Sequence, residues 1–125
     1  MNKKRIFIAC ADERLRIALV IFLEGEPGMT VVGFTDRLEN LLPQMEAAQA
    51  EILLLEWNLS EEAMTDLLLK IHHISVQYKI IFFARDPEER RKITAAGADY
   101  VILKNAPPDE LLPILKRIDM QSTNV

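Results

Sequence analysis

The chain has 125 residues, half of them hydrophobic and 27% charged, with a formal net charge of −4. This size and composition are typical of one globular domain, and the acidic balance argues against nucleic-acid binding, which needs clustered positive charge. No apolar run approaches the roughly 20 residues of a membrane span, and the run after Met1–Arg5 is too short for an export signal. The single cysteine, Cys10, leaves no internal disulfide, which suits a reducing cytoplasm. We therefore expect one cytoplasmic domain over 1–125, in which 119–125 is a polar tail or the start of a linker.

Five short segments rich in Ile, Val, Leu and Phe are expected to be strands. Their continuous apolarity is typical of strands that are buried on both faces of a sheet. In chain order they are Arg5–Cys10, Thr30–Phe34, Glu51–Leu55, Lys79–Phe83 and Asp99–Leu103.

Apolar residues spaced three and four apart fall between and after these strands and predict amphipathic helices. The stripes are Leu15/Leu19/Phe22/Leu23, Leu38/Leu41/Leu42/Met45, Met64/Leu67/Leu68/Ile71 and Leu111/Ile114/Leu115/Ile118. Another helix is predicted over Pro87–Ala96, because Asp86 suits its N-cap and Gly97 its end. Pro43 is expected to kink or restart the second helix. Strands that alternate with helices predict an α/β fold with a parallel sheet covered on both faces.

Two segments carry a family resemblance that extends from Arg5 to Ile118. Ala95–Lys104 (AAGADYVILK) resembles the fifth strand of the receiver domains of bacterial response regulators, and Glu51–Glu56 (EILLLE) resembles their third strand. The resemblance implies a CheY-like, flavodoxin-like three-layer α/β/α fold with a five-stranded parallel sheet of order 2-1-3-4-5. It also implies a part in two-component phosphorelay signalling.

A working receiver has an acidic pair after strand one, which holds Mg²⁺, and a phosphoryl-accepting aspartate after strand three. The resemblance places Cys10 and Ala11 at the acidic pair, and neither is a hard oxygen ligand. It places Glu56 at the acceptor position, where the side chain is one methylene longer than aspartate. We therefore expect no catalytic residue, no metal or other cofactor, and no enzymatic activity.

The remaining receiver positions are a Thr or Ser after strand four, a switch aromatic in strand five and a lysine after it. The hydroxyl position carries Ala84 or, with a different gap, Phe83, and the switch position carries Val101. Lys104 alone is retained, and a single lysine does not transfer a phosphoryl group. The sequence thus resembles a receiver whose phosphoryl chemistry has been lost.

The roles of three residues, at positions 12, 56 and 57, are left open by the sequence. Asp12 is expected to cap the first helix or face solvent, in preference to binding a metal. Glu56 is either an imitation of a phosphorylated aspartate that reaches Lys104, which we favour, or a solvated acid at a strand end. Trp57 is expected to cover the acidic pocket or to meet a partner.

The resemblance implies action through protein–protein interaction without regular aspartate phosphorylation. The expected partner surface is formed by helix four, strand five and helix five, with Arg90, Arg91, Tyr100 and Asp109 among its residues, and a weak homodimer through it is expected. No direct contact of this domain with nucleic acid or membrane is expected. Two alternatives stay open, an atypical phosphoryl-accepting receiver and the N-terminal receiver half of a DNA-binding transcriptional regulator.

Overall fold

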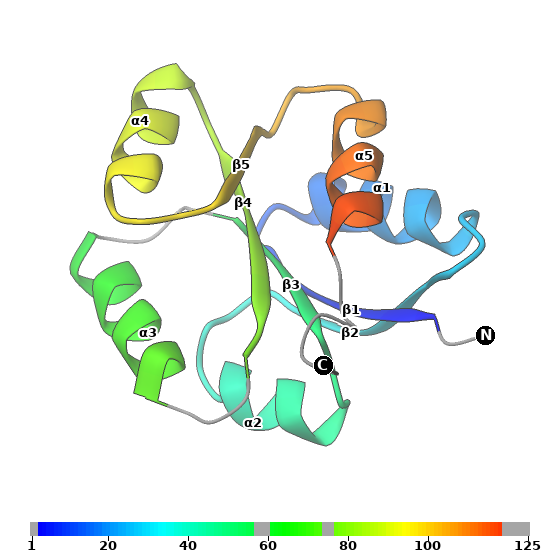
Figure 1. The fold of residues 1–125 in the computed structure, drawn as a ribbon, viewed down its shortest axis with the longest axis horizontal. Helices are drawn as coiled ribbons and strands as arrows, with labels where there is room; N and C mark the ends of the chain where they lie inside the picture. The colour runs from blue at the N-terminus through cyan, green and yellow to red at the C-terminus, as the bar shows by residue number, and fades with distance from the viewer. Residues whose placement is uncertain (1–2, 57–60, 74–76, 119–125) are drawn as a thin grey trace.

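Five parallel strands form one sheet in the order β2-β1-β3-β4-β5 (Figure 1). The computed structural model of the protein describes residues 3–56, 61–73 and 77–118. The sheet order implied by the family resemblance is confirmed, and so is the α/β class. Trp57 and the expected tail at 119–125 lie outside the described residues.

The strands and helices alternate along the chain as the sequence predicts. The strands are β1 (Lys4–Ala9), β2 (Met29–Thr35), β3 (Ile52–Glu56), β4 (Lys79–Ala84) and β5 (Tyr100–Leu103). The helices are α1 (Glu13–Glu24), α2 (Leu41–Ala47), α3 (Glu61–His73), α4 (Pro87–Ala95) and α5 (Leu111–Arg117), and a short 3₁₀ helix, η1 (Pro108–Glu110), precedes α5. Within the described part of the chain, no helix is long and apolar enough to cross a membrane.

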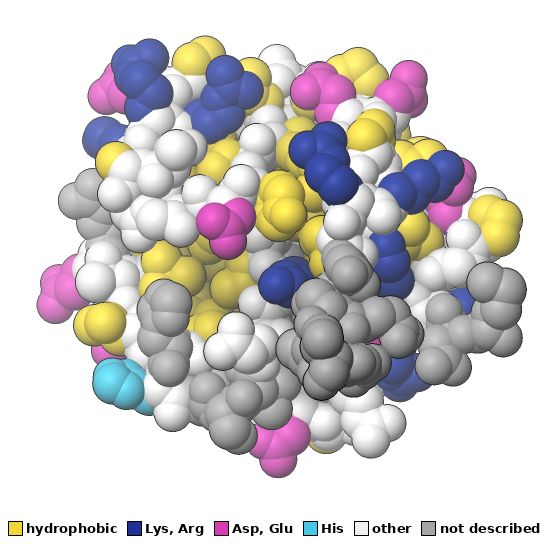
Figure 2. All heavy atoms as spheres, viewed as in Figure 1, with side chains coloured by type: hydrophobic (Ala, Val, Ile, Leu, Met, Phe, Trp, Pro, Cys, Tyr) yellow, Lys and Arg dark blue, Asp and Glu magenta, His cyan; other side chains and the backbone are white. Residues whose placement is uncertain are grey.

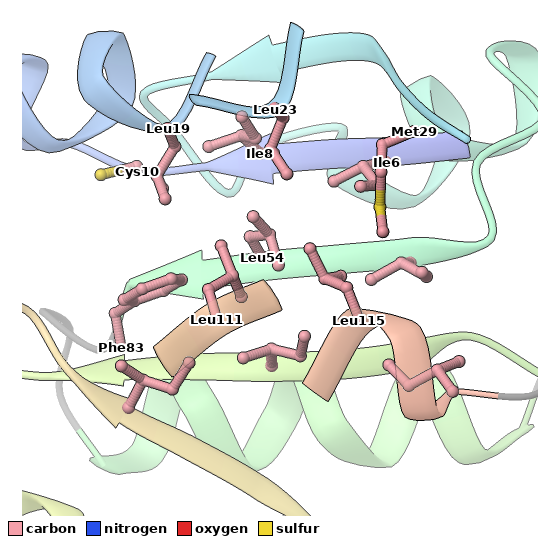
Figure 3. Close-up of a cluster of buried hydrophobic side chains, with 14 residues drawn as sticks. Ile6, Ile8, Cys10, Leu19, Leu23, Met29, Leu54, Phe83, Leu111 and Leu115 are labelled. Atoms are coloured by element: carbon pink, nitrogen blue, oxygen red, sulfur yellow. The ribbon is translucent and has the colours of Figure 1, made fainter. Parts of the chain in front are cut away.

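Alternate side chains of the central strands enter two separate cores, as expected for a sheet buried on both faces. On one face, Ile8 and Leu54 pack with α1 and α5 (Figure 3). On the other face, Phe7 and Leu53 pack with α2, α3 and α4. Every side chain of β3 is buried, because this strand lies at the centre of the sheet.

The starts of two helices are fixed by aspartates at strand ends. The Asp12 carboxylate accepts hydrogen bonds at the start of α1, and the Asp86 carboxylate accepts one from the Glu89 backbone N–H (2.8 Å) at the start of α4. Pro87 takes the first turn of α4, and Gly97 follows its end at a φ of +106°. The predicted ends of this helix are therefore confirmed.

The second helix starts later than its apolar stripe predicts. It begins at Leu41, so Leu38 lies before it and packs on the core from the preceding loop. Pro43 therefore falls in the first turn, where a backbone N–H would have no partner within the helix. The expected kink or restart at Pro43 is wrong for this reason.

Candidate functional site

The carboxylate of Glu56 is the centre of a polar cluster at the carboxyl end of the sheet. Glu56 ends β3 and is only 4% exposed. Its Oε1 atom accepts hydrogen bonds from the backbone N–H groups of Ala11 (2.8 Å) and Asp12 (3.0 Å) and from Cys10 Sγ (3.4 Å). The end of β3 is thereby tied to the junction between β1 and α1.

The second oxygen of this carboxylate meets a lysine from the other side of β4. Lys104 Nζ donates a hydrogen bond to Glu56 Oε2 and lies 3.1 Å from Asp12 Oδ2. Lys104 follows β5, and its backbone N–H donates to Ala84 O (2.8 Å), which holds the lysine against the end of β4. The contact between Glu56 and Lys104 that the sequence favoured is present in the structure.

The two carboxylate oxygens of Asp12 make different contacts. Its Oδ1 atom accepts from the backbone N–H groups of Arg14 (3.0 Å) and Leu15 (3.2 Å), which confirms the predicted cap of α1. Its Oδ2 atom pairs with Lys104. The sequence did not predict this second contact, because it depends on how near the end of β5 comes to the end of β1.

The charges of the cluster stabilise one another. Burial alone would raise the pKa of Glu56, but hydrogen bonds from Lys104, Asp12 and Cys10 outweigh burial and hold its pKa below the usual value. Burial alone would lower the pKa of Lys104, but Glu56 and Asp12 outweigh it and raise its pKa. The pKa of Asp12 is lowered by the backbone N–H of Leu15 and then by Lys104. Two carboxylates and one ammonium therefore stay ionised near neutral pH.

Cys10 contributes a protonated thiol. Burial, the charge of Glu56 and the hydrogen bond to that carboxylate raise the pKa of Cys10 to about 12, against smaller opposing effects. A thiol with this pKa is a weak donor and a poor nucleophile at neutral pH. Cys10 is buried, and its contact with Glu56 was not predicted from the sequence.

The residues at the other receiver positions carry no polar side chain into the cluster. Ala84 is fully buried and takes part through its backbone carbonyl, while Phe83 points into the core between the sheet, α1 and α5 (Figure 3). Val101 is half-buried and packs on the core of the opposite face. Tyr100 is also half-buried and packs against the core of the α1 and α5 face.

The residues of the cluster do not fit Mg²⁺. This ion prefers near-octahedral oxygen ligands, and Cys10 and Ala11 bring no side-chain oxygen. Asp12 and Glu56 each already pair with the Lys104 ammonium. Among the described residues, no group of three or more His, Cys, Asp or Glu side chains could hold a metal ion.

A small hollow beside Glu56 limits what the cluster could receive. It has a volume of about 80 Å³, room for roughly a few water molecules. Its lining consists of Ala9, Cys10, Ala11, Asp36, Arg37, Leu38 and Glu56.

A larger hollow lies between α3 and α4, and none of Glu56, Asp12 and Lys104 lines it. Its volume is about 360 Å³, and Figure 2 shows hydrophobic side chains gathered there. It is lined by Thr65, Leu68, Leu69, Ile71, Ile80, Phe82, Ala96, Gly97, Ala98 and Asp99.

The expected partner surface carries positive charge on α4, where Figure 2 shows Lys and Arg side chains together. Arg90 and Arg91 are exposed, as is Asp109 on η1. Arg85 is exposed as well and pairs with Glu89, with Nη2 and Oε2 3.2 Å apart. Glu89 is buried and also accepts from the Arg85 backbone N–H (2.8 Å). This buried acid was missed, although a Glu three residues after an N-cap Asp is the signal of a capping box.

The family model of the response regulator receiver domain matches residues 6–116, and the chain therefore belongs to that family. Among solved structures, it is similar to a CheY-like receiver domain protein from Methanospirillum hungatei JF-1, with 27% identity and a TM-score of 0.76 over 99% of this chain and 100% of that chain. It is also similar to the receiver domain of a putative NarL regulator from Mycobacterium tuberculosis, with 16% identity and a TM-score of 0.78 over 93% of this chain and 95% of that chain.

A third similar structure is the RcsB response regulator of Salmonella typhimurium, with 18% identity and a TM-score of 0.77 over 93% of this chain. This chain spans 60% of the length of that RcsB chain. No curated protein sequence matches this chain.

Proposed function

We propose that this receiver domain transmits a signal by docking to proteins, without regular phosphorylation of an aspartate. The observation that carries the proposal is the Glu56 carboxylate, which stands at the acceptor position with both of its oxygens already bound. Its donors are Lys104, the thiol of Cys10 and two backbone N–H groups.

The contacts of Glu56 support a phosphoryl-acceptor position at which the carboxylate oxygens are already bound by groups of the protein itself. A transferred phosphoryl group needs an open carboxylate, aligned for in-line attack, and cations that neutralise its oxygens. Oε1 of Glu56 is turned toward Ala11 and Asp12, and Oε2 faces Lys104. A phosphoryl donor would have to displace these contacts before it could reach either oxygen.

The same contacts give a physical reason for a permanent conformation. Lys104 bridges carboxylates from two different strand ends, so the ends of β1, β3 and β5 are held together without any added group. Glu56 thus supplies negative charge next to Lys104 at all times, which is the role proposed for it as an imitation of a phosphorylated aspartate.

The surface formed by α4, β5 and α5, with η1 at the start of α5, is the proposed docking site for a signalling partner. Its exposed Arg90 and Arg91 favour an acidic surface on that partner. Lys104 directly follows β5. The polar cluster around Glu56 and the docking surface are therefore connected through this one short strand.

A titration of Mg²⁺ tests the proposal, with fluorescence of the single tryptophan, Trp57, as the readout. We expect no saturable change up to about 10 mM Mg²⁺, because the carboxylates of Asp12 and Glu56 are paired with Lys104. Saturable quenching in the low millimolar range would contradict the proposal.

The similarity to RcsB favours a second candidate, the receiver half of a DNA-binding regulator. RcsB is a response regulator with conformational dynamism for DNA interaction, and this chain spans 60% of that one. The full length of the gene product distinguishes the candidates, because a DNA-binding regulator would carry a further domain after the receiver.

A further inference from the structure

The outward face of α1 carries a stripe of exposed side chains that the Glu56 cluster does not use. Leu19 and Leu23 point from α1 into the core, and the stripe lies on the opposite side of the helix. Its members are Arg14, Ile17, Ile21 and Glu24, and all four are exposed. Their alternating spacing of three and four residues is the spacing with which one helix contacts another.

The middle of this stripe is apolar and open to solvent. Ile17 is 50% exposed and Ile21 is 70% exposed. Side chains four residues apart are neighbours on a helix, so the two isoleucines form one patch. This patch is charged at both ends, and contiguous apolar patches rimmed by polar residues mark interaction sites, unlike apolar side chains that are exposed singly.

We propose that α1 pairs with α1 of a second copy of this chain, antiparallel and about a two-fold axis. Arg14 and Glu24 lie equally far from Leu19 along the helix, and so do Ile17 and Ile21. A two-fold axis level with Leu19 therefore places Ile17 of one copy against Ile21 of the other, and Arg14 against Glu24. The stripe is complementary to itself, as a two-fold interface requires.

The charges along α1 select a second copy in this orientation. Glu24 ends the helix and Glu26 follows it, whereas the start carries Arg14 and Arg16. Arg16 pairs with Glu13 of the same helix, with Nη2 and Oε2 3.9 Å apart, so Arg14 is the positive group that faces outward. An antiparallel pair brings unlike charges together at both ends, whereas a parallel pair would bring like charges together.

The flanks of the stripe permit close approach. Ala18 is exposed on one side of the stripe and Val20 is half-buried on the other. The same two-fold axis places Ala18 of one copy beside Val20 of the other copy. The short side chain of Ala18 lets the two helix axes come near beside the isoleucine patch. Since α1 has 12 residues, about 18 Å, the contact is short, and we expect a dissociation constant on the order of 10–100 μM.

The pairing can be tested by sedimentation equilibrium of the full chain, at concentrations up to several times the expected dissociation constant. Ile21→Gln should weaken self-association at least about tenfold, since the patch supplies most of the buried apolar area. Leu69→Gln is the matched control, because Leu69 is 54% exposed on α3 and lies outside the stripe. It should leave the association unchanged.

A charge exchange tests the orientation. Arg14→Glu and Glu24→Arg should each weaken association about three- to tenfold, and the double variant should regain most of the loss because unlike charges meet again. Arg90→Glu with Arg91→Glu should have no effect on this pairing, which separates it from the weak homodimer that the sequence led us to expect through the α4 surface. A chain that stays monomeric throughout, an association that survives Ile21→Gln, or a double variant weaker than either single variant would overturn the proposal.

Discussion

The Glu56 carboxylate and the Lys104 ammonium meet in front of the end of β4, because β3 and β5 flank that strand in the sheet. The pair is asymmetric in burial, since the side chain of Glu56 is 3% exposed and that of Lys104 is 26% exposed. Removing the glutamate therefore leaves the partly buried N–H groups of Ala11 and Asp12 without their acceptor, whereas removing the lysine leaves a carboxylate that these N–H groups still hold.

Replacement of the buried acid should destabilise the fold. We expect Glu56→Ala to lower the free energy of unfolding by about 2–4 kcal/mol, because the N–H groups of Ala11 and Asp12 lose their acceptor. Urea unfolding measures the change. Glu13→Ala is the control, since that acid is exposed and pairs with Arg16 at the surface, so its loss should cost less than about 1 kcal/mol. An equal decrease in the free energy of unfolding for the two variants would show that the cluster stabilises the fold no more than an exposed ion pair does.

Coupling between the two charged residues can be measured separately. A double-mutant cycle of Glu56→Gln and Lys104→Met should give a coupling free energy of about 1–3 kcal/mol, because the two side chains are in direct contact. Additive losses, with a coupling near zero, would mean that the contact is absent in solution.

The cluster should also shape the dependence of stability on pH. The folded-state pKa of Glu56 is lowered from its usual 4.5, so its stabilisation is present above that value and is lost as the pH falls through the folded-state pKa. We expect Glu56→Gln to flatten the decline in the free energy of unfolding between about pH 5 and pH 3. Parallel curves for wild type and variant would contradict the lowered pKa.

The sequence predicted well the strands and helix starts that position this site, but it predicted the side-chain contacts of the site only in part. The strands follow from continuous apolar runs, and the caps at Asp12 and Asp86 follow from residue types at helix starts. The contact between Glu56 and Lys104 could be anticipated because the carboxyl ends of parallel strands meet at one edge. The hydrogen bond from Cys10 could not be predicted, since it depends on side-chain rotamers that no spacing rule fixes. The second contact of Asp12 could not be predicted either, since it also depends on how near the end of β5 comes to the end of β1.

The thiol should be inert in the folded protein. Because the pKa of Cys10 is raised to about 12, we expect essentially no reaction with a disulfide reagent at pH 8 in native buffer and complete reaction in urea. Absorbance of the released thiolate follows the reaction. Stoichiometric modification of the native chain within minutes would contradict the buried, protonated thiol.

Oxygen ligands at the first strand end should restore metal binding. A triple variant, Cys10→Asp, Ala11→Asp and Glu56→Asp, supplies the carboxylates that the family uses and shortens the side chain that reaches Lys104. We expect millimolar Mg²⁺ affinity for the triple variant and none for Glu56→Asp alone, with circular dichroism as the check on folding. Mg²⁺ binding by the single variant would mean that Cys10 and Ala11 are not what prevents it.

The proposal that this domain acts without phosphorylation at the Glu56 position can be tested by measuring the intact mass of the chain after incubation with acetyl phosphate and Mg²⁺. The triple variant serves as the positive control and should gain the mass of one phosphoryl group. We expect an unchanged mass for the wild-type chain under the same conditions. A Mg²⁺-dependent phosphoryl adduct on the wild type, abolished by Glu56→Gln, would contradict the proposal.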